Sequence, residues 1–481
     1  MIRSTRKRLG GLALIRDDDI PLYRQIYEHI RTAIRTGQLR PGDRLPSTRG
    51  LAERFGTARG TIDAAYAILT GEGYLIGRGP AGTVVSAELD SRTIAGAASK
   101  PRLRSPAPRP AAEAPRAFQM GLPALDAFPR KVWSRLVARH ARGFAAADMA
   151  YPDPAGYGPL REAIAGYLAA SRGVRCTAGQ ILITNGYQDA LNLVASVLLQ
   201  RGDKVWLEDP NYPPTGEALK AATATLVPIP VDAEGLRVFD GVARARRASL
   251  AVVTPSHQSP LGVALSLPRR LALLGWASAA GAWIIEDDYD SEFRYVGRPL
   301  PALKSLDRDD RVLYAGTFSK VLYPSLRLGY LVVPDSLLVA FVRSNRLRHL
   351  GPATLEQRVV ADFMAAGYFA RHLKRMQTLY AARRRALADG LSTVFGSRIC
   401  VDLKPGGMHL IARFAAGVRD VELATLAQAA GLAVEALSRR ATAPACGQGL
   451  LLGFTNIAEA DALDACRRLY RVIGKSLEKR M

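Results

Sequence analysis

Short apolar runs alternate with helical stretches across residues 180–333. The runs are "QILIT", "KVWLED", "ATLVPI", "LAVVTP", "AWIIEDD", "RVLYAG" and "RLGYLVV". Strands that alternate with helices in this way pair mainly in parallel, and such a sheet is covered by helices. The pattern therefore predicts an α/β domain with a mainly parallel sheet, whose ligand site lies at the carboxyl ends of the strands.

Polar residues gather at those strand ends. They include a carboxylate, a tyrosine, two hydroxyls, a lysine and an arginine. They also include a turn that leads into a helix start, which can bind an anion. The residues are Gly186, Tyr187, Asp287, Tyr289, Thr317, Ser319, Lys320 and Arg327. Pyridoxal phosphate needs this set, because its aldehyde condenses with a lysine, its ring nitrogen pairs with a carboxylate, and its phosphate binds amides, hydroxyls and a guanidinium. Burial would lower the pKa of Lys320 and free the amine for that condensation.

The first part of the chain has a different pattern. Leu22, Ile26, Ile30 and Ile34 share one helical face, and Gly37 follows as a helix stop. Two short helices joined at Gly56 come next, the first with Ser47 or Thr48 as its N-cap, and together they predict a helix-turn-helix. Two strand-like segments around a Gly/Pro turn with Arg78 then predict a β-hairpin, or wing.

The glycines of this wing fit the spacing G-x-G-x-x-G, which occurs in dinucleotide sites. They are Gly77, Gly79 and Gly82. A dinucleotide site requires a helix directly after the glycines, and here the β-branched run Thr83 to Val85 follows instead. We therefore interpret the motif as a hairpin turn.

The stretch "PLYRQIYEHIRTAIRTGQLRPGDRLPSTRGLAERFGTARGTIDAAYAILTGEGYL" resembles the winged helix-turn-helix of GntR-type bacterial regulators. The resemblance implies binding to a double-stranded DNA operator. One position departs from the family, since Ala58 stands where a serine is usual, and Thr57 is the candidate to take over its contact. The residues implied to face DNA are Ser47, Arg49, Thr57, Arg59, Thr61, Arg78 and Gly82.

The segment "TFSKVLYPSLRLG" is similar to the lysine motif of fold-type I aminotransferases. "YPDPAGYGPLREAIAGYL", "TNGYQDAL", "EDPNYPP", "TPSHQSPLG" and "EDDYDSEFRY" follow the order of that family. The resemblance implies that Lys320 forms the Schiff base, Asp287 binds the ring nitrogen and Tyr289 the ring hydroxyl. It implies that Tyr212 stacks on the ring. The residues implied to bind phosphate are Gly186, Tyr187, Thr317, Ser319 and Arg327, with Tyr151 reaching the phosphate of the neighbouring subunit.

Two motifs depart from ordinary aminotransferases. "TPSHQSPLG" lacks the usual asparagine that contacts the ring hydroxyl, and His257 or Gln258 are the candidates to replace it. Leu451 stands where many aminotransferases have the arginine that binds the substrate carboxylate, and Arg439 is our candidate replacement. Four other histidines match no site motif and are expected to be structural or surface residues: His140, His349, His372 and His409.

Residues 87–117 are rich in Pro, Ala, Ser and Arg without apolar periodicity, which predicts a flexible linker. It would separate a DNA-binding domain at 16–86 from an effector domain at 118–481. This combination resembles the MocR subgroup of GntR regulators, whose relatives control vitamin B6, γ-aminobutyrate, taurine and D-alanine related genes. The resemblance implies a head-to-tail, domain-swapped homodimer that binds pyridoxal phosphate and responds to it or to an amino acid or amine.

Two other functions stay open from the sequence. A working aminotransferase with an accessory N-terminal domain is the main alternative, although the altered carboxylate motif speaks against it. A DNA-binding protein with an empty domain conflicts with the intact Lys320, Asp287, Tyr289 and Arg327. Control of vitamin B6 synthesis is the first expectation for a target, by analogy only.

Charge and composition support an anionic partner. The formal net charge is +23, and the sequence has no apolar run long enough to span a membrane, so nucleic acid is favoured over lipid. The basic start of the chain lacks the apolar region of a signal peptide, which predicts a cytoplasmic protein. No metal site is expected, because the cysteines Cys176, Cys400, Cys446 and Cys466 have no ligand spacing.

Overall fold

The computed structural model describes residues 14–15, 20–87, 114–297, 300–414, 418–442 and 446–478. The chain divides into two compact units, residues 1–112 and 113–481. Of the linker expected at 87–117, residues 88–113 lie outside the described residues, as do residues 16–19 of the expected DNA-binding domain. The exact boundaries of the three segments therefore stay predictions.

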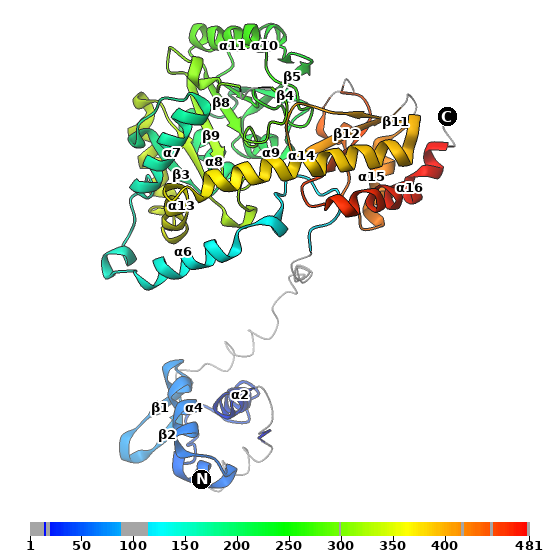
Figure 1. Ribbon diagram of the computed structural model, residues 1–481. Coiled ribbons are helices and arrows are strands. Elements are labelled where there is room, and N and C mark those ends of the chain that lie inside the picture. Colours follow the sequence, from blue (N-terminus) through cyan, green and yellow to red (C-terminus); the bar gives the residue numbers. More distant parts are fainter. Residues whose placement is uncertain are drawn as a thin grey trace. The chain divides into compact units, whose positions relative to one another are not determined.

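The first unit is a winged helix-turn-helix (Figure 1). Its elements are α2 (Leu22–Arg35), α3 (Thr48–Phe55), α4 (Arg59–Gly71), β1 (Leu75–Gly77) and β2 (Thr83–Val85). Ser47 caps α3, since its Oγ accepts a hydrogen bond from the Gly50 amide at 3.2 Å, and Gly56 ends the helix in the left-handed conformation. The core includes Ile26, Ile30, Ile62, Leu69 and Val85.

An eight-stranded sheet forms the centre of the second unit. Its order is β3-β10-β9-β8-β7-β4-β5-β6. The strands are β3 (Ile181–Thr184), β4 (Lys204–Asp209), β5 (Thr225–Asp232), β6 (Gly235–Leu236), β7 (Leu250–Val253), β8 (Trp283–Asp288), β9 (Val312–Thr317) and β10 (Gly329–Val332). The pairs from β5 through β4, β7 and β8 to β9 are parallel, whereas β10 runs antiparallel to both of its neighbours. The expected α/β fold with a mainly parallel sheet is confirmed.

Helices cover both faces of this sheet, because its strands are apolar on both sides. Leu182 and Leu313 belong to a core that includes Leu191 of α8 (Tyr187–Leu198), Leu219 of α9 (Pro213–Ala221) and Phe341 of α12 (Leu338–His349). The opposite face packs on α7 (Gly158–Arg172), α10 (Val238–Ala245), α11 (Leu267–Ala280) and α13 (Leu355–Ala365).

A smaller antiparallel sheet completes the second unit. Its strands are β11 (Ile399–Asp402), β12 (His409–Phe414), β13 (Glu435–Ala436) and β14 (Gly449–Gly453). Figure 1 shows the long helix α14 (Tyr368–Phe395) running from α13 to this sheet. The remaining α-helices among the described residues are α6 (Arg130–Arg142), α15 (Asp420–Ala429) and α16 (Ala462–Glu478).

The described helices include none that is both long and apolar enough to cross a membrane. Within the same described ranges, His, Cys, Asp and Glu side chains form no cluster of three or more suited to a metal ion. Cys176, Cys400, Cys446 and Cys466 are all free thiols.

Candidate cofactor site and DNA-binding surface

The sheet topology brings the predicted cofactor residues to one edge. The first residue of β10, Gly329, pairs with the last residues of both β3 and β9, Thr184 and Thr317. The ends of β3 and β9 therefore lie on either side of one residue, and β8 ends beside β9. Residues that follow these strands converge on a common site.

Lys320 lies in the turn after β9 and is partly buried. Its Nζ donates a hydrogen bond to the carbonyl of Gly121 at 2.7 Å. Burial lowers the pKa of Lys320, because a charged ammonium is poorly solvated there, and the charges of Asp290 and Asp287 oppose this effect. The site thus favours a more reactive amine than an exposed lysine offers.

Asp287, near the end of β8, is the acidic counterpart of this lysine. Burial raises its pKa to about 8, the neighbouring acids Asp288, Glu208 and Asp290 add to the rise, and a hydrogen bond from the Tyr187 hydroxyl opposes it. None of the described basic side chains forms an ion pair with it. A buried carboxyl of this kind fits a protonated ring nitrogen, which would supply the missing positive partner.

The predicted phosphate residues surround the start of α8. Gly186 precedes the helix with φ of 90°, a conformation that favours glycine, and an added Cβ there would lie 3.3 Å from the Arg327 guanidinium. Arg327 is itself left-handed with φ of 50°, and its Nη2 donates to the Asn185 carbonyl at 2.8 Å. The free amides of the helix and this guanidinium suit a phosphate. Across the edge, the Ser319 amide donates to Thr317 Oγ1 at 3.2 Å.

His257 and Gln258 face different partners. His257 Nδ1 lies 3.1 Å from the Tyr289 hydroxyl and 3.1 Å from each carboxylate oxygen of Asp290. The Gln258 amide is used elsewhere, since its Nε2 donates to Glu208 and to the Pro210 carbonyl. Of the two candidates, His257 is therefore the one that contacts Tyr289.

The side chains of Arg439 and its neighbour Arg440 contact different parts of the structure. Arg439 Nη2 reaches Thr425 of α15 at 3.5 Å. Arg440 forms an ion pair with Glu435, and its guanidinium lies 5.8 Å from the centre of the Tyr212 ring. The charge of Arg440 also contributes to the lowered pKa of Lys320. Arg440, which the sequence analysis missed, is thus the arginine of this pair beside the predicted cofactor residues.

The local structure explains why Arg440 faces this site. Residues 437–440 form one turn of 3₁₀ helix, in which side chains three apart lie on the same face. Leu437 is fully buried, so Arg440 rather than Arg439 shares its inward side. Sequence reasoning missed Arg440 because the sequence did not show that this segment is helical.

The other predicted residues have varied surroundings. Tyr151 is 84% exposed in the single chain, as a side chain that reaches a second subunit would be. His140 pairs with Asp362, His349 with Asp189 in the first turn of α8, and His372 with the Val321 carbonyl. His409 lies near the site, with its ring centre 6.1 Å from that of His257, and burial lowers its pKa to about 4.

In the first unit, the predicted DNA-facing residues lie around the start of α4 and on the wing. Arg49 and Arg59 are exposed and form only surface pairs with Glu53 and Asp63, at 3.3 and 3.5 Å. Ala58 is the N-cap of α4 and offers no side-chain cap, so the first amides of this helix stay available to a phosphate. Arg78 is exposed on the hairpin turn, which its amide closes by donating to the Gly82 carbonyl at 2.8 Å.

Two family models match the chain. "Bacterial regulatory proteins, gntR family" matches residues 22–85, and "Aminotransferase class I and II" matches residues 133–448. The chain is 41% identical to the "Probable rhizopine catabolism regulatory protein MocR" of Rhizobium meliloti, over 93% of this chain and 92% of that protein. The chain belongs to the MocR-type GntR regulators.

Other relatives agree with this assignment. The regulator is 33% identical to the "HTH-type pyridoxine biosynthesis transcriptional regulator PdxR" of Corynebacterium glutamicum, over 89% of this chain and 91% of that protein. Its second unit resembles LysN, the α-aminoadipate aminotransferase of Thermus thermophilus complexed with N-(5'-phosphopyridoxyl)-L-leucine. That similarity has a TM-score of 0.68 and 28% identity, covering 76% of this chain and 93% of that one. The regulator is a pyridoxal phosphate-dependent, DNA-binding transcription factor.

The raised pKa of Asp287 leads to a stability prediction. Its pKa is about 8 in the folded, cofactor-free protein, against an ordinary value of 3.8. Below about pH 4 the carboxyl is protonated in both the folded and the unfolded state. Between about pH 4 and pH 8 only the folded state keeps the proton, so the stability that this proton provides is lost as the pH rises through 8. Asp287→Asn should therefore raise the free energy of unfolding of the cofactor-free regulator at pH 9, by on the order of a few kcal/mol, and raise it less at pH 5, where the folded carboxyl still holds its proton.

Urea unfolding at both pH values measures this difference. Asp335→Asn, at an exposed position, is the matched control for the loss of a carboxylate. An equal effect of Asp287→Asn at pH 5 and pH 9 would contradict the assignment of a buried, protonated carboxyl.

Proposed function

We propose that this regulator holds pyridoxal phosphate covalently through Lys320 and changes its DNA binding when an amino compound reaches that site. The observation that carries the proposal is the burial of Lys320 and Asp287 in one site, with the pKa of the amine lowered and that of the carboxyl raised. When bound, the cofactor supplies an aldehyde carbon that accepts primary amines. Asp287 would hold the ring nitrogen, and Tyr289 with His257 would hold the ring hydroxyl.

The phosphate and the flat face of the ring have their own partners in this proposal. The amides after Gly186, the hydroxyls of Thr317 and Ser319, and Arg327 would bind the phosphate. Tyr187 would support Asp287 through its hydroxyl, and Tyr212 would stack on the ring.

An acidic amino compound fits the remaining features of the site better than the cofactor alone. The Arg440 guanidinium lies beside the Tyr212 ring, where it can bind a carboxylate or a similar acid group. Its present partner Glu435 is partly exposed, so an incoming carboxylate can compete for Arg440. The relatives' names refer to rhizopine catabolism and to pyridoxine biosynthesis, and genes for amine or vitamin B6 metabolism are accordingly the proposed targets.

The hydrogen bond from Lys320 to Gly121 offers a route from the site to the rest of the chain. Gly121 belongs to a segment fixed to the small sheet, because Gly453 donates to the Phe118 carbonyl at 2.9 Å and Thr455 donates to that of Leu122. This segment is the first described part of the second unit. A ligand that changes the protons on Lys320 alters that hydrogen bond, and can thereby favour one arrangement of the chain over another.

On the DNA side, we propose that Arg49, Arg59 and Arg78 contact the operator, with Ser47, Thr57, Thr61 and Gly82 close to its backbone. A head-to-tail dimer would present two such units to paired half-sites, and the exposed Tyr151 supports a contribution to the partner's phosphate site. A regulator that acts on bacterial DNA would work in the cytoplasm.

The alternative function is that of a working aminotransferase. Sustained keto-acid production from the loaded protein and an amino acid over many turnovers would favour it over the proposed regulator.

The DNA assignment predicts the effect of Arg59→Ala. Removing this exposed cation should weaken binding to the DNA upstream of the regulator's own gene, and reduce the slope of log K against log salt concentration by about 1. Fluorescence anisotropy at several salt concentrations measures both. Arg35→Ala removes an equal charge from the end of α2 and should leave the slope unchanged. Equal losses in the two variants would indicate only a general effect of charge.

The effector assignment predicts different effects at two adjacent arginines. Arg440→Met should retain the visible absorbance of the loaded protein but lose, by about tenfold or more, its spectral response to amino acids, because the acid group loses its partner. Arg439→Met is the matched control and should respond like the unmodified regulator. A normal response from Arg440→Met, or a loss in Arg439→Met alone, would reverse the assignment.

A further inference from the structure

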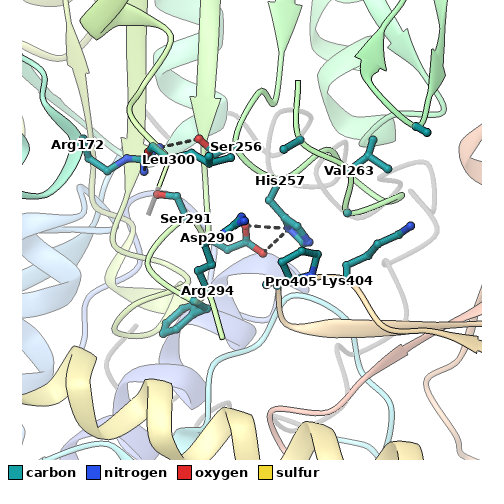
Figure 2. A pocket seen from close by; sticks show the side chains of 16 residues that line it. Arg172, Ser256, His257, Val263, Asp290, Ser291, Arg294, Leu300, Lys404 and Pro405 are labelled. Carbon is teal, nitrogen blue, oxygen red and sulfur yellow. Dashed lines mark hydrogen bonds and ion pairs between the residues drawn. The ribbon is translucent and has the colours of Figure 1, made fainter. Parts of the chain in front are cut away.

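A cavity lies behind His257. It has a volume of about 300 Å³, and among the predicted cofactor residues only His257 lines it. Figure 2 shows the His257 ring between the carboxylate of Asp290 and the side chain of Lys404. His257 therefore forms a wall between this cavity and the Tyr289 hydroxyl, which it contacts on its other side.

The cavity lies at a joint within the second unit. One wall comes from residues 290–294 after β8, and the other from residues 404–407 between β11 and β12. The two walls are hydrogen-bonded, since the Gly407 amide donates to the Phe293 carbonyl at 2.8 Å and the Tyr295 amide to that of Pro405 at 2.8 Å. At Gly407, with φ of 94°, an added Cβ would lie 2.2 Å from the His257 ring, so glycine is required there. Specific hydrogen bonds and a required glycine therefore define the shape of this cavity.

Donor groups in the wall lack partners. Arg294 Nε and Ser291 Oγ are buried and make no hydrogen bond. A buried donor without a partner costs free energy, and a guest with acceptor oxygens would recover it. Arg172 also borders the cavity, but its guanidinium is already bonded to Asp288 at 2.7 Å, to Ser256 and to the Leu300 carbonyl.

The charges favour an anion. No carboxylate among the described residues pairs with Arg294. Lys404 Nζ lies 3.0 Å from Asp402, but that carboxylate also pairs with Arg413 at 3.8 Å, so its charge is shared between two cations. The one acid of the wall, Asp290, faces His257 at 3.1 Å. The cavity is therefore left with excess positive charge.

The guest should also carry a carbon skeleton. Apolar side chains make up much of the remaining wall, namely Val263, Ala264, Phe293, Leu300 and Pro405. Apolar walls with a few placed polar groups are typical of sites for small organic ligands, and a volume near 300 Å³ is at the small end of that range. An inorganic ion would leave these apolar surfaces without a partner.

We propose that this cavity is a second ligand site, which binds a short-chain organic acid next to the cofactor site. An acid group lies against Arg294 and Ser291, Lys404 supplies a second positive charge on the other side of the cavity, and the carbon chain lies against Val263 and Phe293. A ligand bound here touches both walls of the joint and the histidine that contacts Tyr289.

Isothermal titration with succinate tests the proposal. Saturable binding of one succinate per chain is expected, with the neutral succinamide and inorganic phosphate binding at least tenfold more weakly. Lys404→Met should reduce the affinity about tenfold or more by removing a charge. Ala264→Phe should abolish binding by filling the cavity without removing a charge. Lys374→Met, at an exposed position on α14, is the matched control and should bind like the unmodified protein.

The titrations are carried out on both the cofactor-loaded and the cofactor-free protein. Binding in both forms that is lost in Lys404→Met and in Ala264→Phe supports the second site. The absence of saturable binding, binding that survives both substitutions, or binding only in the cofactor-free form would overturn it. The cofactor-free titration tests this cavity even if Lys320 does not hold the cofactor, so the two proposals fail separately.

Discussion

The desolvation of one lysine and one aspartate at the edge of the main sheet is the constraint on which the site depends. Each group is held where its charged form is disfavoured, so the pKa of Lys320 falls and that of Asp287 rises. A protein would not retain two such costly groups for its own stability. A ligand with an amine-reactive carbon at one end and a protonated nitrogen in its ring makes use of both.

Sequence patterns predicted the architecture well because the main sheet is buried on both faces. Seven continuous apolar runs became β3, β4, β5, β7, β8, β9 and β10, and the polar residues after them met at one edge as parallel pairing requires. The cap at Ser47 and the turn at Gly56 followed from local chemistry in the same way. Such features depend on a few neighbouring residues, which the sequence displays directly.

Contacts between distant segments were harder to predict. The sequence left His257 and Gln258 as equal candidates, and the choice depends on Glu208 and Asp290, which lie on different strand ends. Arg439 was the candidate and Arg440 was missed, because nothing in the sequence gave the direction of a single 3₁₀ turn. The hydrogen bond from Lys320 to Gly121 joins residues 199 positions apart, and the cavity behind His257 exists only where two loops meet.

These parts together describe a sensor whose cofactor site contacts both a neighbouring cavity, through His257, and the beginning of its own domain, through Gly121. The central claim is that Lys320 carries the cofactor, and borohydride reduction of the loaded regulator followed by peptide mass mapping tests it most directly. The account predicts a pyridoxyl phosphate adduct on the peptide that contains Lys320. An unmodified Lys320 peptide from cofactor-saturated protein, or an adduct on another lysine alone, would contradict it.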